Sequence, residues 1–317
     1  MKVVSSIEEI RFFIREKRCE AIKNDQELCV SFVPTMGALH NGHLNLIKQA
    51  KHQQSKNTLV VVSIFVNPLQ FGPNEDFDRY PRNLTEDLEE LKELADCVFT
   101  PEIKNIIGKE ELIKMDAGPV SKVLEGKTRP NYFDGVLTIV AKLFNIVQPD
   151  VALFGKKDAQ QVGEIKGIFS YFDSYPNIIH LQSLFIIQQM VTSLNFPLQI
   201  ISIETQREPD GLAYSSRNKY LNFEDRKLSL ILFKTLNTGL EEAKKGSKLT
   251  NILEEMKIYF EENNKLNKII LDYLVVVEAK TFKQIEEDGF NGEAILLIAA
   301  IVCGTRLIDN IDVKIGF

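Results

Sequence analysis

Short apolar runs alternate with segments of helical spacing through the first half of the chain. Strands are predicted at the apolar runs, which cover residues 29–33, 59–66, 96–100, 151–154 and 197–203. Helices are predicted where apolar residues recur every three or four positions, from about residue 42, at 84–95 and at 136–147. Nearly continuous apolar strands with helices between them are typical of a parallel sheet that helices cover on both faces. We therefore predict an α/β fold with a doubly wound parallel sheet.

The pattern changes after about residue 205. Two long helical patterns, at 228–246 and 249–264, are followed by apolar strands at 271–278 and 294–302. This order is typical of a smaller α+β unit, and the length of 317 residues also favours two domains. We predict a larger domain at residues 1–205 and a smaller one at residues 206–317.

The composition narrows the class of protein. With 38 basic and 44 acidic side chains the net charge is −6, which disfavours binding to nucleic acid or to an anionic membrane. The four cysteines form no CxxC pair, so we expect buried thiols in a reducing compartment rather than disulfides or a zinc site; they are Cys19, Cys29, Cys97 and Cys303. The late apolar run at 294–303 is too short for a membrane helix, and the N-terminus lacks a signal-peptide core. We predict a cytoplasmic protein.

The loop after the first strand of the predicted sheet is the strongest candidate for chemistry. Gly37 and Gly42 let a ligand approach the backbone, and the helix that follows aims its N-terminus at the loop, where phosphate binds well. His40 and His43 there can donate hydrogen bonds to phosphate oxygens and stabilise charge that develops at phosphorus. A helix cap plus one surface histidine is the plainer alternative. A zinc site is disfavoured because the HxxH spacing lacks the glutamate of a zinc-protease helix.

Polar clusters also follow other strands of the sheet. Asn67 and Gln70 can orient a polar substrate, residues 155–158 offer lysines and an aspartate, and residues 214–218 offer hydroxyls and a guanidinium. Each cluster taken alone fits a solvated loop as well. Because ligands of open α/β sheets bind at the carboxyl ends of the strands, the clusters together favour transfer at a nucleotide phosphate.

Seven motifs, in order along the chain, resemble those of the pantothenate synthetase (pantoate–β-alanine ligase) family. They are MGALHNGH at 36–43, VNPLQF at 66–71, DFDRYPR at 76–82, LEGKTRP at 124–130, FGKKD at 154–158, SSRN at 215–218 and RLIDN at 306–310. The HxGH pattern alone indicates only the wider nucleotidylyltransferase superfamily, whereas the full set is specific. The resemblance implies a Rossmann-like fold of the HxGH nucleotidylyltransferase type.

The resemblance also implies the reaction. ATP drives the condensation of pantoate with β-alanine through a pantoyl-adenylate, with release of AMP and pyrophosphate. Mg²⁺ is expected to travel with ATP rather than to occupy a protein site. The family further implies a homodimer in which the C-terminal domain acts as a lid. A nucleotide-binding homologue without ligase activity is the alternative that we carry forward.

Residue roles carry over by motif. The residues implied to bind ATP are Met36, Gly37, Ala38, Leu39, His40, Asn41, Gly42, His43, Gly155, Lys156, Lys157, Asp158, Gln206, Tyr214, Ser215, Ser216 and Arg217. His43 is the implied catalytic histidine, with His40 and Lys157 beside it on the phosphates. Gln70 and Gln161 are implied to hold pantoate, with Asn67 nearby.

The chain departs from the family pattern at three places. Tyr214 and Gln206 stand where smaller or apolar residues are usual. Residues 162–183 look like an insertion between Gln161 and the helical pattern that resumes at Leu184. The segment is either a surface excursion packed by its own aromatic residues or translated intron sequence, since valine codons begin with GT and a glutamine codon can end in AG. An insertion here would displace Gln161, and this is the reason for the alternative of a nucleotide-binding homologue without ligase activity.

Overall fold

The computed structural model describes residues 1–52, 57–73, 75, 77–108, 113–155, 178–203, 207–214, 218, 221–264 and 268–316. The chain divides into two compact units. One comprises Met1–Gly155 and Ser183–Ile203, and the other comprises Lys156–Gln182 and Glu204–Phe317. Each unit is described by itself below.

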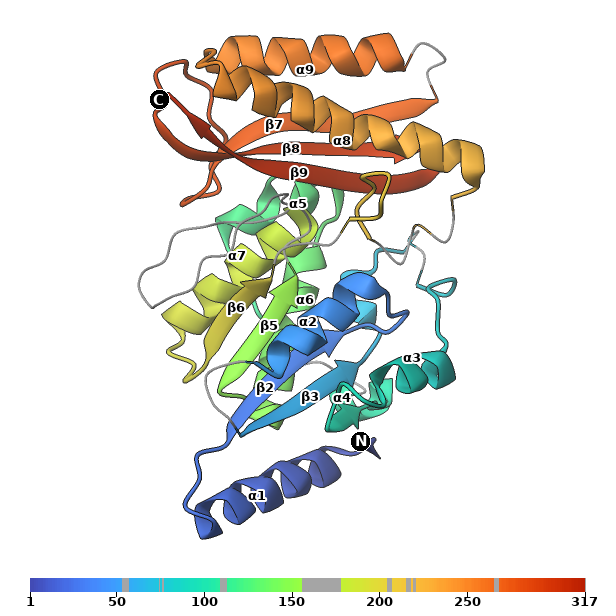
Figure 1. Cartoon of the computed structure of the whole chain (residues 1–317), viewed down its shortest axis with the longest axis vertical. Coiled ribbons are helices and arrows are strands. Elements are labelled where there is room, and N and C mark those ends of the chain that lie inside the picture. The colour runs from blue at the N-terminus through green and yellow to red at the C-terminus, as the bar shows by residue number, and fades with distance from the viewer. Residues whose placement is uncertain are drawn as a thin grey trace. The chain divides into compact units, whose positions relative to one another are not determined.

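A parallel sheet forms the centre of the first unit (Figure 1). Within the part of the chain that the structure describes, its six strands are β1 (Lys2–Val4), β2 (Cys29–Thr35), β3 (Thr58–Ile64), β4 (Cys97–Phe99), β5 (Val151–Gly155) and β6 (Gln199–Ile203). Their order across the sheet is β1-β4-β3-β2-β5-β6, and every neighbouring pair is parallel. The predicted α/β class and parallel sheet are therefore confirmed, although the pattern did not predict β1.

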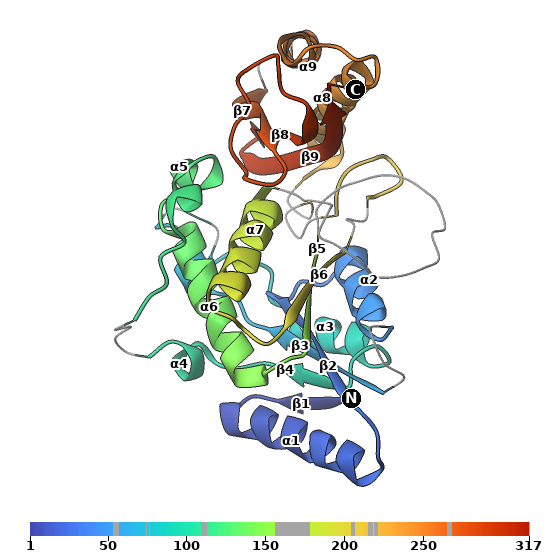
Figure 2. The ribbon, with the colours of Figure 1, turned by 90° about the vertical axis from the view of Figure 1, so that its left-hand side faces the viewer.

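Helices cover both faces of this sheet. They are α1 (Ile7–Lys23), α2 (Asn41–Ala50), α3 (Leu84–Leu91), α4 (Ile103–Ile106), α5 (Glu125–Thr128), α6 (Tyr132–Val147) and α7 (Ile178–Ser193), with short 3₁₀ turns η1 (Pro68–Gln70) and η2 (Pro119–Lys122). Figure 2 shows α6 and α7 on one face and α2 on the other. Because side chains alternate along a strand, Phe32 of β2 packs edge-on against Phe144 of α6 at 6.4 Å, whereas Val33 joins the cluster that contains Ile47 of α2.

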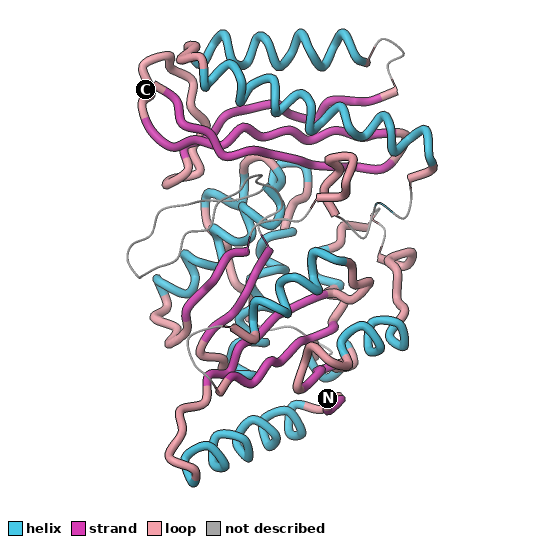
Figure 3. Tube along the Cα trace, in the orientation of Figure 1, coloured by secondary structure: helices cyan, strands magenta, loops and turns pink. Residues whose placement is uncertain are grey.

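The second unit is a small antiparallel sheet with two helices on one face (Figure 3). Its described strands are β7 (Ile269–Glu278), β8 (Gly292–Val302) and β9 (Thr305–Ile315), in the order β7-β8-β9, and its helices are α8 (Phe223–Lys244) and α9 (Leu249–Asn263). The sequence predicted both helices and the first two strands. It missed β9 because Asp309 occupies an inward position of that strand, between the buried Leu307 and Ile311.

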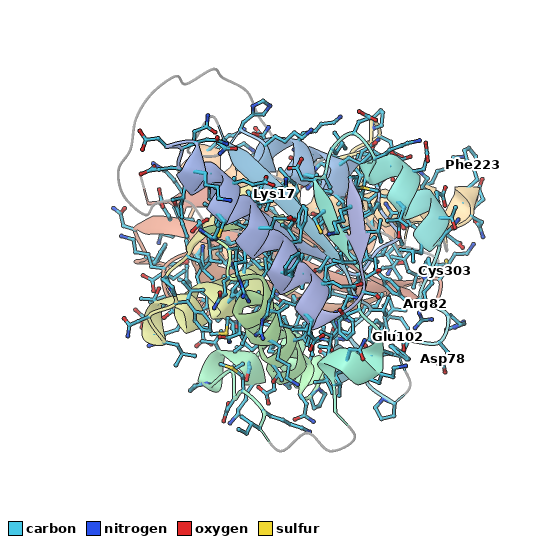
Figure 4. All side chains as sticks on the ribbon, turned by 90° about the horizontal axis from the view of Figure 1, so that it is seen from below. Lys17, Asp78, Arg82, Glu102, Phe223 and Cys303 are labelled. Atoms are coloured by element: carbon cyan, nitrogen blue, oxygen red, sulfur yellow. The ribbon has the colours of Figure 1, made fainter. Side chains whose placement is uncertain are left out.

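Two expectations change. Cys29 and Cys97 are buried, and burial raises the pKa of Cys97 to about 12. Cys19 and Cys303 are exposed, so the expectation of four buried thiols is wrong; Cys19 lies on an exposed position of α1 and Cys303 in the turn between β8 and β9 (Figure 4). Of the segment 162–183, residues 178–183 belong to α7, six residues earlier than the predicted pattern, and 162–177 lie outside the described residues.

No helix in the described part of the chain is both long enough and apolar enough to span a membrane.

Candidate active site

The first unit changes the direction of its winding between β2 and β5. From β2 the chain continues to β3 on one side, and from β5 it continues to β6 on the other. Ligands of such sheets bind outside the carboxyl ends of the strands at this switch point. The loop 36–40 follows β2, η1 follows β3, and Gly155 is the last residue of β5. The histidine loop and the amide pair therefore follow two neighbouring strands, and Gly155 ends a third, all at the carboxyl ends of the sheet.

His40 is the N-cap of α2. Its backbone is extended, with φ −149 and ψ 172, and its Nδ1 accepts a hydrogen bond from the Gly42 N–H at 3.2 Å. Because Nδ1 is the acceptor, the proton of the neutral ring lies on Nε2. The cap expected from the plainer alternative is therefore present, and it also fixes which nitrogen of His40 can donate to a ligand.

His43 lies in the first turn of α2, directly against His40. The two ring centroids are 4.0 Å apart, with 31° between the ring planes. Burial lowers the pKa of His43 to about 4, so the ring is neutral at neutral pH. Its Nδ1 is buried and has no hydrogen-bond partner among the described residues. The pair therefore offers N–H donors at the N-terminus of the helix, without the positive charge of an imidazolium at His43.

The turn before His40 has an unusual backbone. Gly37 and Ala38 are both left-handed, with φ 76 and 52, and both are buried. Thr35 Oγ1 accepts from the Gly37 N–H at 3.2 Å and donates to the Ser63 carbonyl at 2.7 Å. The carboxylate of Asp87, on α3, accepts from the N–H groups of Ala38 at 3.0 Å and Leu39 at 2.8 Å. A side chain of β2, a backbone carbonyl of β3 and a side chain of α3 thus fix the path of the loop.

The remaining predicted residues of this loop differ in exposure. Met36 and Leu39 are partly buried, and Asn41 is exposed at the first position of α2. Met36 also lines a cavity of ≈ 440 Å³ at the ends of β3 and β4. Arg82 and Glu102, both labelled in Figure 4, line the same cavity.

The two amides after β3 form one hydrogen-bonded unit. Asn67 is buried, and its Nδ2 donates to Gln70 Oε1 at 2.9 Å and to the Gly135 carbonyl at 3.1 Å. Its Oδ1 accepts from the Leu69 N–H at 3.0 Å. Both amide protons and the oxygen of Asn67 are therefore used within the protein. Because Gln70 accepts through Oε1, its NH₂ group is the end that faces away from Asn67.

Arg129 fixes the same turn from the other side. Its Nη2 donates to the Gln70 carbonyl at 3.1 Å, its Nε donates to Glu75 Oε1 at 2.6 Å, and its guanidinium lies 3.9 Å from the Tyr132 ring centroid. Despite the cost of burial, the bonds to Glu75 keep the pKa of Arg129 above its ordinary value. The turn that carries Gln70 is thus held by a buried amide and a partly buried ion pair.

Several predicted residues lie outside the described residues. They are Lys156, Lys157, Asp158, Gln161, Gln206, Ser215, Ser216 and Arg217. Tyr214 is described and lies in the second unit. The segment that leads to it is fixed by ion pairs of Arg226 with Glu208 and Asp210.

Sequence reasoning missed Asp87 and gave no role to Arg129. A signal existed for Asp87, since it occupies the inward position of a helical stripe that also contains Leu88 and Leu91. Arg129 lies within the LEGKTRP motif but is distant in sequence from Glu75 and Gln70. In the described ranges, no three His, Cys, Asp or Glu side chains converge where they could hold a metal ion.

Comparison with known proteins agrees with this geometry. The family model described as pantoate-beta-alanine ligase matches residues 2–183 and 179–312, so its two matched stretches meet inside the segment 162–183. A pantothenate synthetase from Acidothermus cellulolyticus is 44% identical over 90% of this chain and 86% of its own length. One from Carboxydothermus hydrogenoformans is 40% identical over 99% of this chain and 100% of its own.

Solved structures agree as well. The pantothenate synthetase of Thermus thermophilus superposes with a TM-score of 0.79 at 36% identity, covering 98% of both chains. A Francisella tularensis pantoate-beta-alanine ligase, complexed with beta-gamma ATP and β-alanine, gives a TM-score of 0.70 at 31% identity, covering 98% of this chain and 97% of its own. With the family model, the relatives and the fold in agreement over nearly the whole length, this chain belongs to the pantoate–β-alanine ligase family.

Proposed function

We propose that this chain condenses pantoate with β-alanine at the expense of ATP. A carboxylate oxygen of pantoate attacks the α-phosphorus of ATP, the bond from that phosphorus to the bridging oxygen breaks, and pyrophosphate leaves. The amine of β-alanine then attacks the pantoyl carbonyl, loses a proton and displaces AMP. The observation that carries the proposal is the adjacent pair of His40 and His43 at the switch point of the sheet, within a family whose named members are ligases.

The two imidazoles act on the phosphates. His40 donates through Nε2, since its Nδ1 is used by Gly42. An N–H at the buried Nδ1 of His43 would have no acceptor among the described residues, so we infer that the neutral ring carries its proton on Nε2 and donates from there. Donors fixed before ATP binds stabilise the charge that grows on the oxygens of the α-phosphoryl group as the carboxylate attacks. By motif, Lys157 supplies the positive charge that neutral imidazoles lack, and residues 155–158 and 214–217 complete the nucleotide site.

Gln70 holds pantoate, a role that the family motif also gives to Gln161. The NH₂ group of Gln70 is a donor that suits the carboxylate or a hydroxyl of pantoate. Asn67 has no unused amide proton, so its part is to orient Gln70 rather than to bind the substrate. This division of roles refines the expectation that both amides contact pantoate.

Other parts of the proposal stay predictions of the resemblance. Mg²⁺ would be carried by the phosphates of ATP, where it neutralises charge on pyrophosphate as it leaves. The domain at 206–317 would close over the site as a lid, and two copies would form a homodimer in the cytoplasm.

Isotope exchange tests the proposal. With pantoate and ATP but without β-alanine, labelled pyrophosphate should enter ATP, because adenylate formation is reversible. Release of AMP should require all three substrates. Calorimetry that shows ATP binding without pantoate binding, and no exchange, would instead identify a homologue disabled at residues 162–183, an alternative that the comparisons do not support.

A further inference from the structure

A buried carboxylate lies directly behind the histidine loop. Asp87 is only 4% exposed, although it belongs to a helix, α3, whose neighbouring acidic residues are exposed. Its two oxygens accept from two consecutive backbone N–H groups, those of Ala38 and Leu39. Successive N–H groups next to left-handed residues form a concavity that binds anions. Here the anion is a side chain of the chain itself.

The fit between Asp87 and the loop is tight. A Cβ added to Gly37 would lie 2.8 Å from Asp87 Oδ2 and 3.0 Å from Ile64 Cγ2, and the φ of 76 already disfavours any other residue. Ala38 adopts φ 52 without the freedom of a glycine, which costs about 1 kcal/mol or more unless surrounding contacts fix it. The hydrogen bonds to Asp87 are contacts of that kind, and they hold Ala38 and Leu39, the two residues that precede His40.

We propose that Asp87 is a positioning residue for the adenylation step, which fixes the left-handed turn and thereby the placement of His40 and His43. By occupying the N–H groups of Ala38 and Leu39, it also keeps the phosphates of ATP from binding there and leaves them to the imidazoles and the N-terminus of α2. This inference rests on the proposed function. The hydrogen bonds that hold Gln70 in the described part of the chain come from Asn67 and Arg129, so we expect pantoate binding to be independent of Asp87.

Asp87→Asn is the direct test. The carboxamide keeps the size of the side chain but can accept at only one atom, so its NH₂ group meets one of the two N–H groups. In the exchange assay we expect kcat to fall by about tenfold to a hundredfold, because a small displacement of the groups that contact the reacting atoms has an effect of this size. KM for pantoate should stay within about twofold of the original. In the ligand-free protein, the imidazole ¹⁵N resonances of His40 and His43 should shift, and that of His52 should not.

The control is Glu90→Gln, which removes one negative charge from an exposed position of the same helix. It should leave kcat and all histidine resonances unchanged. If Asp87→Asn does not fold, Asp87→Glu retains the charge but is longer than the space beside Gly37, and the same loss of kcat and shift of resonances are expected. Unshifted His40 and His43 resonances, or unchanged kcat, in the folded variant would overturn the proposal. The histidine resonances are measured without substrate. They therefore test whether Asp87 positions His40 and His43 even if the wild-type protein shows no exchange of pyrophosphate into ATP.

Discussion

The protonation of His43 determines what the histidine pair can do at the residue scale. We predict that the C2 proton of His43 titrates with a midpoint near pH 4, because burial lowers its pKa to about 4. Between pH 4 and 6.5 the unfolded chain binds more protons at this site than the folded chain, so the free energy of unfolding rises with pH across this window. An NMR titration and urea unfolding at several pH values measure both effects.

His43→Gln should remove this part of the pH dependence, whereas His52→Gln, at an exposed histidine, should retain it. A midpoint for His43 at its ordinary value of about 6.5 would show that burial does not lower its pKa. A midpoint above pH 7 would make the ring a cation at neutral pH, contrary to the mechanism proposed above.

Asn67 and Gln70 are a second case in which one residue acts through another. Asn67→Ala frees Gln70 to rotate, removes the side-chain acceptor of the Leu69 N–H and removes one donor to the Gly135 carbonyl. We predict that KM for pantoate rises by about tenfold, that KM for ATP changes little, and that unfolding becomes easier by about 1–3 kcal/mol.

A double-mutant cycle separates orientation from direct binding. If Asn67 works only through Gln70, then Asn67→Ala adds nothing to KM for pantoate once Gln70→Ala is present. Additive effects of the two substitutions on KM would mean that Asn67 contacts the substrate itself.

At the scale of elements, η1 and α6 approach so closely that only glycine fits between them. A Cβ on Gly135 would lie 2.2 Å from the Leu69 carbonyl oxygen. Gly135→Ala should therefore displace η1, raise KM for pantoate and destabilise the protein by about 1–3 kcal/mol. Gly289→Ala, where nothing lies within 4 Å, is the matched control and should be neutral in kinetics and thermal unfolding. An unchanged KM for Gly135→Ala would show that the position of η1 does not matter to pantoate.

The elements also show what a sequence pattern can predict. The strands β2, β3 and β5 were predicted to within about two residues because both faces of each strand are buried and a polar cluster follows each one. The histidine pair followed from the same reasoning, since a loop after a strand and before a helix is a local feature. Asp87 and Arg129 could not be placed in this way, because their partners are 48 and 59 residues away in sequence. Their roles depend on which elements the sheet order brings together.

At the scale of the whole molecule, two ion pairs between residues distant in sequence, one partly buried and one nearly fully buried, hold loops that carry family motifs. Glu75 and Arg129 do so in the first unit, and Arg207 and Asp309 in the second. In the second pair Arg207 donates to both oxygens of Asp309, at 3.2 and 3.1 Å, and to the Gly211 carbonyl at 2.6 Å. Its guanidinium also lies 3.9 Å from the Phe233 ring centroid. Asp309 thereby joins the RLIDN motif of β9 to the segment that leads to the SSRN motif.

We predict that Asp309→Asn is among the more damaging single substitutions in the second unit. It removes the carboxylate charge that faces the nearly buried guanidinium of Arg207, since the two side chains are 9% and 6% exposed, and the loss of this buried ion pair should cost about 3–5 kcal/mol in urea unfolding. Because residues 207–214 lead to the predicted phosphate-binding loop, KM for ATP should rise while KM for pantoate stays the same. Asp272→Asn breaks the more exposed pair with Arg306 on the same sheet and should cost less than about 1 kcal/mol. Equal losses of unfolding free energy for the two variants would mean that burial does not distinguish the two ion pairs. An unchanged KM for ATP in Asp309→Asn would show that the RLIDN motif does not affect nucleotide binding.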